Sequence, residues 1–106
     1  MTTTTDRIRA LNDELRQHLI GGHAVITPGI AALGQEAVER LVKTIAVFDD
    51  FCHANDPYQE HDFGCFKVDG HSIMFKIDLY EESDVKRANG EPVVTRVLTI
   101  MLADEY

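Results

Sequence analysis

Residues 63–80 read FGCFKVDGHSIMFKIDLY, and this stretch decides the fold. On both sides of Asp69-Gly70, apolar residues alternate with polar ones, which is the period of a β-strand with one buried face. Asp-Gly is a favoured pair for a two-residue type I′ turn, because both central residues of that turn have positive φ. The pattern therefore predicts a β-hairpin in which Gly64 faces Phe75.

Two segments before the hairpin carry the spacing of amphipathic helices. In residues 8–19, and again from Gln35 to about Phe51, apolar side chains recur every three or four positions. Thr4 or Thr5 can cap the first helix, and Gly21-Gly22 can end it because glycine readily adopts the left-handed conformation. Asp49 and Asp50 fall in the last predicted turn of the second helix, where negative charge opposes the helix dipole. Either that helix ends earlier, or these carboxylates have another use.

Two further segments are expected to be strands. Residues 23–27 are short and β-branched, and residues 93–102 contain two β-branched runs, whereas residues 81–92 read as a polar connection. The order α-β-α-β-β-β predicts an α+β fold, with two helices packed on one face of an antiparallel sheet of about four strands and the other face partly exposed or a contact surface. The length of 106 residues suits a single domain, 1–106, with residues 1–5 frayed.

The charge is distributed unevenly along the chain. Residues 1–47 contain five acidic and five basic residues, whereas residues 48–106 contain thirteen acidic and five basic ones. The second part therefore carries the whole net charge of −8. An acidic surface repels nucleic acid and anionic lipid and attracts a basic protein surface. We expect no direct binding of nucleic acid.

The sequence shows no signal for membrane insertion, secretion or cofactor binding. No apolar run approaches the ~18–20 residues of a membrane span, and the N-terminus lacks the features of a secretory signal. The two cysteines lack C-x-x-C spacing and are expected to be free, buried thiols in a reducing compartment. No phosphate-binding loop, dinucleotide motif, nucleophile elbow or H-E-x-x-H motif occurs. These features predict a cytoplasmic protein without a cofactor.

The segment from Asn55 to Gly64, NDPYQEHDFG, holds the densest group of polar residues. Its Glu60-His61-Asp62 triplet could act as an acid–base site or hold a divalent metal, with Lys76 and Asp78 of the hairpin nearby. The competing interpretation is a solvated acidic loop. A zinc site is a further alternative, because four ligand types follow the pattern C-H-x7-H-x3-C: Cys52, His53, His61 and Cys65. Against zinc, the first two ligands are adjacent, whereas structural zinc sites separate them.

Four blocks of the sequence resemble a family of small bacterial proteins described only as a domain of unknown function. The blocks are residues 21–34, 55–64, 76–80 and 96–106, and NDPYQEHDFG is the most specific of them. The resemblance covers about residues 6–106. It implies genes on plasmids, prophages and integrative elements, often beside counter-defence functions, and it supplies no catalytic residue and no cofactor.

Charge and resemblance together lead to one hypothesis. The chain would be an acidic inhibitor from a mobile element, an anti-CRISPR or anti-restriction protein that occupies a basic surface of a host nucleoprotein complex. There are three competing hypotheses. The acidic residues could serve only to keep the protein soluble, the protein could be a small metal-binding or hydrolytic enzyme, or it could be an oligomeric scaffold that uses the open sheet face. Both a monomer and a homodimer remain open. The residues expected to contact the partner are Asp49, Asp50, Asp56, Glu60, Asp62, Glu81, Glu82 and Asp84.

Overall fold

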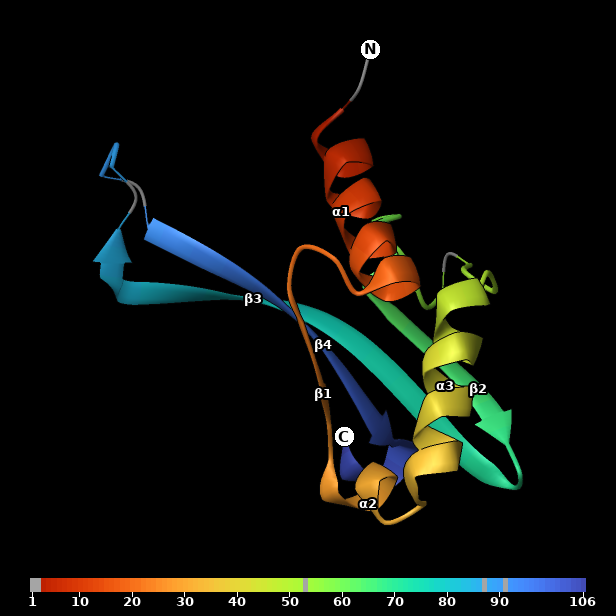
Figure 1. Cartoon of the computed structure of the whole chain (residues 1–106). Helices are drawn as coiled ribbons and strands as arrows, with labels where there is room; N and C mark the ends of the chain where they lie inside the picture. The colour runs from red at the N-terminus through yellow and green to blue at the C-terminus, as the bar shows by residue number, and fades with distance from the viewer. Residues whose placement is uncertain (1–2, 53, 87, 91) are drawn as a thin grey trace.

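A computed structural model describes residues 3–52, 54–86, 88–90 and 92–106, and for residues 82–86 and 92 it describes the backbone alone. The described elements form a four-stranded sheet with helices, which confirms the predicted α+β class (Figure 1). Their bounds are α1 Thr4–His18, β1 His23–Ile26, α2 Pro28–Ala31, α3 Gln35–Val47, β2 Phe63–Val68, β3 His71–Lys86, β4 Pro92–Leu102 and the 3-10 helix η1 Ala103–Glu105.

The β2–β3 hairpin forms in the predicted register, with Gly64 opposite Phe75. Asp69 and Gly70 have φ angles of 52° and 81°, as a type I′ turn requires. Gly64 is buried, and a Cβ at this position would collide with the rings of Phe75 and Phe48. The missing side chain at residue 64 therefore allows the two rings to pack directly against β2.

The sheet is mixed, in the strand order β1-β4-β3-β2. The β2–β3 and β3–β4 pairs are antiparallel as expected, but β1 pairs with β4 in parallel. For β1 the expectation of an all-antiparallel sheet is therefore wrong. Periodicity indicates which side chains share a face, but it does not indicate the direction of a neighbouring strand. The chain passes through α2, α3 and the hairpin before it returns as β4 beside β1.

Helix α3 begins at Gln35 as predicted, but the start of α1 and the ends of both helices differ from the prediction. The hydroxyl of Thr3 caps α1 by accepting a hydrogen bond from the Asp6 N–H, one residue before the predicted pair of threonines. The helix is closed by Leu19, which adopts a left-handed conformation with φ of 55°, and not by a glycine. Helix α3 ends at Val47 and does not reach Phe51. Its shorter length follows from contacts with α1 that are described below.

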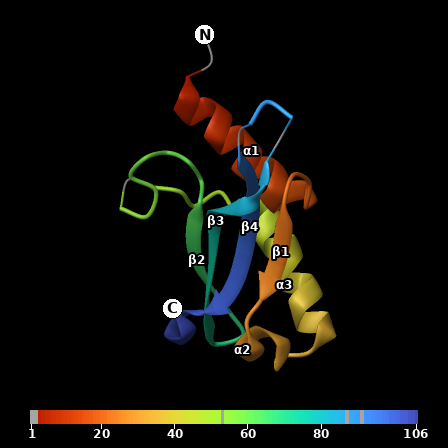
Figure 2. The same ribbon diagram turned by 90° about the vertical axis from the view of Figure 1, so that its left-hand side faces the viewer.

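The apolar core lies between one face of the sheet and the helices α1 and α3, which Figure 2 shows behind the four strands. The opposite sheet face is only partly exposed: Met74 and Met101 on it are 8% and 4% exposed, and Phe63 contacts Tyr106. No described helix is long and apolar enough to cross a membrane. The core residues are Leu15, Ile30, Leu41, Ile45, Ile73, Phe75, Ile77, Leu98 and Ile100.

Strands β3 and β4 continue beyond the other two strands as a two-stranded projection (Figure 1). Strand β2 begins opposite Lys76 and β1 begins opposite Val97, so in the described part of the chain residues 78–86 of β3 and 92–96 of β4 have no other strand beside them. We call this projection the β arm. The prediction of an irregular connection over residues 81–92 is therefore wrong at both of its ends. Polar residues are compatible with a strand that is exposed on both faces.

Candidate functional site

The polar face of α1 holds the loop between α3 and β2. Arg9, Asn12, Asp13 and Arg16 follow one another at the spacing that places side chains on one side of a helix. Asn12 and Arg16 are each only 3% exposed. Because such burial requires partners for polar groups, this face of α1 belongs to the interior and is not a solvated surface.

Arg16 joins α1 to the end of α3. Its Nη1 donates hydrogen bonds to the carbonyl oxygens of Ile45 at 2.8 Å and Phe48 at 2.7 Å. Its Nη2 donates to Asp13 Oδ1 at 2.9 Å. The last carbonyls of a helix lack intrahelical donors and carry the negative end of its dipole. Arg16 supplies both the donors and the positive charge, and this accounts for the end of α3 at Val47.

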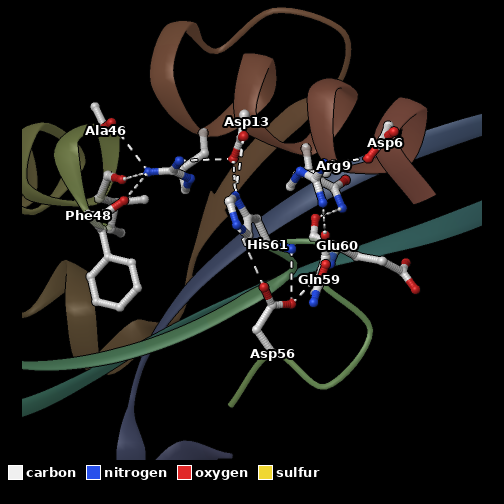
Figure 3. A network of polar contacts seen from close by, with 12 residues as sticks. Asp6, Arg9, Asp13, Ala46, Phe48, Asp56, Gln59, Glu60 and His61 are labelled. Carbon is white, nitrogen blue, oxygen red and sulfur yellow. Dashed lines mark hydrogen bonds and ion pairs between the residues drawn. The ribbon is translucent and has the colours of Figure 1, made fainter. Parts of the chain in front are cut away.

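His61 is the centre of the contact between α1 and the loop (Figure 3). Its Nδ1 lies 2.9 Å from Asp13 Oδ1, and its Nε2 lies 3.7 Å from Asp56 Oδ2. The imidazole is stacked on the ring of Phe51, with 3.9 Å between the ring centroids. The guanidinium of Arg16 also lies over this ring, at 5.2 Å. Asp13 thus links the arginine that ends α3 to the histidine that anchors the loop.

The first two residues of the NDPYQEHDFG block shape the loop from within. Asp56 is 4% exposed, and its Oδ1 accepts hydrogen bonds from the backbone N–H groups of Glu60 at 3.0 Å and His61 at 3.1 Å. Asn55 Oδ1 accepts a hydrogen bond from the backbone N–H of Cys52 at 2.9 Å. Such bonds from Asn and Asp side chains to nearby backbone favour turns. The block is therefore first of all a structural element.

Side chains from α1 bind the backbone of the same loop, and a side chain from β4 supports one of them. Arg9 Nη1 donates to the carbonyl of Gln59 at 3.0 Å, and Asn12 Nδ2 donates to that of Glu60 at 2.9 Å. Arg96 Nε on β4 donates in turn to Asn12 Oδ1 at 2.7 Å. Gln59 and His61 have positive φ angles of 58° and 56°. These three contacts help to hold two non-glycine residues in a conformation that they rarely adopt.

A shallow cavity of about 300 Å³ opens beside His61. Because Nδ1 is occupied by Asp13, only Nε2 could exchange a proton with a molecule bound there. The cavity is lined by Arg9, Phe51, Cys52, Asp56, Gln59 and His61.

The predicted acid–base triplet does not converge. The partners of His61 are Asp13 and Asp56, and not the adjacent Glu60 and Asp62. Burial, followed by the nearby charges of Asp56 and Asp78, raises the pKa of Asp62. Asp78 itself is paired with Lys76 on the sheet face opposite the helices, with 3.1 Å between Nζ and Oδ2. The five residues of the enzymatic interpretation are therefore divided between two faces of the molecule.

The zinc ligand set is also divided. Cys52 lies in the loop and Cys65 in β2, and both thiols are exposed, so the expectation of buried cysteines is wrong. His61 is engaged by Asp13. His53 lies outside the described residues. Within the described part of the chain, no three His, Cys, Asp or Glu side chains are grouped to hold one metal ion.

The acids expected to contact a partner lie in two separate regions. Asp49 and Asp50 are exposed just after α3, and Glu60 and Asp62 are half-buried further along the loop. Asp56 is buried and occupied by backbone donors, so it is not a surface residue. The remaining acids belong to the β arm: Glu81, which is exposed, and Glu82 and Asp84, whose side chains lie outside the described part of the structure.

Sequence reasoning missed the residues of α1. Arg9, Asp13 and Arg16 read as an ordinary polar helix face, and the one local signal against this reading is Asn12, a poor helix former beside the apolar stripe. Their partners lie 29 to 50 positions away, which no periodicity indicates.

The comparisons with known proteins place the chain in a family. The model of the family "Protein of unknown function (DUF3768)" matches residues 26–105, so α1 lies outside the match and the NDPYQEHDFG block lies inside it. No curated protein and no solved structure matches significantly. Because the family model covers more than half of the chain, the protein belongs to the DUF3768 family, which is described as proteins of unknown function.

Proposed function

We propose that the protein is an acidic binding module that inhibits a nucleic-acid-targeting host complex by occupying a basic surface of it. The observation that carries this proposal is that several basic side chains bind groups within the protein and are not available to a partner. Arg16 is buried against α3, Arg96 is bonded to Asn12, and Arg9 is paired with Asp6 and bonded to the loop. The surface is therefore poorer in available positive charge than the composition suggests.

Several acids, in contrast, face the solvent alone. Asp49, Asp50 and Glu81 are exposed, and among the described residues their carboxylates form no ion pair. Charges of this kind raise the association rate with an oppositely charged partner and lose this effect at high salt. They repel nucleic acid, which favours a protein partner.

The identity of the partner class rests on the family resemblance. Genes on mobile elements beside counter-defence functions favour a CRISPR or restriction complex, whose nucleic-acid groove is basic and lies in the cytoplasm. The acids would contact the Lys and Arg side chains that otherwise bind phosphates. In this function the His61 network maintains the fold and performs no chemistry.

The proposal is tested by measuring association with purified CRISPR effector and restriction complexes at about 50 and 500 mM salt, a range over which surface charges become screened. The double variant D49N/D50N is compared with E14Q/E36Q, which removes the same charge from exposed positions in the first half of the chain. We expect salt-sensitive binding that D49N/D50N weakens at least several-fold more than the control. Binding that ignores salt, equal effects of both variants, or no binding to any complex would refute the proposal.

A further inference from the structure

Among the described residues, no strand pairs with the outer edge of β3 along the β arm. Just before the first β2 residue, Phe63, the carbonyl of Asp62 accepts a hydrogen bond from the N–H of Ile77 at 2.8 Å, and beyond it this edge is open in the described part of the chain. In an antiparallel strand the backbone groups alternate between the two neighbours. Since Ile77 points its N–H away from β4, Leu79 and Glu81 also point their N–H and C=O groups outward.

Apolar side chains flank this open edge. Leu79 is 56% exposed and Tyr80 is 52% exposed, and Val94 of the paired strand is 44% exposed. Exposed strand edges with apolar side chains are usually covered in natural proteins, because they bind other strands. The edge therefore offers both unpaired backbone groups and apolar surface to an added strand.

The negative charge along this edge of β3 determines which kind of segment can bind to it. Asp62 lies where the edge begins and Glu81 follows in β3, whereas Asp78 is already paired with Lys76. The sequence adds two more acids at residues 82 and 84. A second copy of the chain that paired through this edge would place acids opposite acids, which is unfavourable across a strand pair. An extended segment with Lys or Arg residues would instead meet opposite charges.

We propose that the outer edge of β3 along the β arm binds an extended, lysine- or arginine-rich segment of the partner protein as an added β-strand. This inference rests on the proposed function and locates its binding surface. The backbone groups of Leu79 and Glu81 supply the strand hydrogen bonds, as in other complexes formed by strand addition. Leu79 and Glu81 share one face of β3 and Tyr80 lies on the other. The cations of the added strand contact Glu81, and Asp62 where the edge begins, and its apolar side chains contact Tyr80 on the opposite face.

The first experiment uses the full chain labelled with 15N and three seven-residue peptides. The probe is KVKVKVK, and the controls are the same sequence with every backbone amide N-methylated, which keeps the charge but cannot donate main-chain hydrogen bonds, and the acidic EVEVEVE. We expect KVKVKVK to shift the amide signals of Leu79 and Glu81, to bind at least about tenfold more tightly than the methylated peptide, and to outcompete EVEVEVE.

The second experiment compares Leu79→Pro with Leu79→Ala. Both variants remove the leucine side chain, but only proline removes the outward N–H, and proline is tolerated on strand edges. We expect Leu79→Pro to bind KVKVKVK several-fold more weakly than Leu79→Ala, while the core amide signals of Phe75 and Ile100 stay in place in both.

The two proposals fail in different ways. If the methylated peptide binds as tightly as KVKVKVK, or if the two Leu79 variants bind alike, strand addition is wrong and salt-sensitive binding of basic complexes is unaffected. If KVKVKVK shifts no arm signal while D49N/D50N weakens binding of a basic complex, the surface lies at the α3–β2 loop and the inference is overturned alone. If neither the peptide nor any complex binds, both proposals are wrong.

Discussion

Replacement of Arg16 by methionine is expected to destabilise the fold strongly. The side chain is 3% exposed and makes hydrogen bonds to Asp13 and to the carbonyls of Ile45 and Phe48. Methionine preserves the apolar part of the side chain but leaves the end of α3 without its donor, and it leaves Asp13 with His61 as its remaining partner. Breaking a fully buried charge pair by removing one partner costs about 3–5 kcal/mol, and because Asp13 is 25% exposed we expect the lower end of this range, about 3 kcal/mol.

This loss is large relative to the whole stability of a domain, which is about 5–15 kcal/mol. With a urea dependence of about 1–2 kcal/mol per molar, the unfolding midpoint should fall by roughly 1.5–3 M. Arg7→Met is the matched control, since Arg7 is exposed on the same helix. We expect the control to change the free energy of unfolding by less than about 0.5 kcal/mol.

The result that would contradict this reasoning is a similar, small loss in both variants. Hydrogen exchange locates the effect: the amides of the last turn of α3 and of the α3–β2 loop should lose protection in Arg16→Met before the sheet does. Equal loss of protection throughout the chain would show that Arg16 has no particular role at the end of α3.

Three further changes test individual contacts. Gly64→Ala should destabilise the fold by about 1–3 kcal/mol in urea unfolding, because its Cβ meets the Phe75 ring, whereas Cys65→Ala on the exposed side should cost little. Burial raises the pKa of Asp62, so ionisation of this carboxyl destabilises the folded state. Asp62→Asn should therefore be more stable than the wild type at pH 7. The difference in stability should vanish once the pH falls below 3.8, the ordinary pKa of the carboxyl, because the group is then protonated in both the folded and the unfolded state. Hydrogen bonds from the Thr27 hydroxyl and from the backbone of Leu102 and Gly29 lower the pKa of Glu105. The ionised carboxylate therefore stabilises the fold at neutral pH, and this contribution is lost as the pH falls through and below 4.5. Thermal unfolding of Glu105→Gln should lack this acid dependence.

The hairpin and the face pattern could be predicted because their causes are local. Asp69-Gly70 specifies a turn with positive φ at both positions, and the alternation around it assigns Phe75 to the buried face. The same reasoning identified the segment around His61 as the densest polar region. It did not identify what that histidine contacts.

The remaining features depend on residues that are distant in sequence. His61 meets Asp13 across 48 positions, and Arg16 reaches carbonyls 29 to 32 positions away. The parallel direction of β1 and the extension of β3 into the β arm likewise arise from where the chain returns. Hydrophobic periodicity and turn chemistry act over a few residues and decide which side of an element is buried. The direction of strands and the partners of buried charges are decided only when the elements pack together, because desolvated polar groups must then be satisfied by whatever lies next to them.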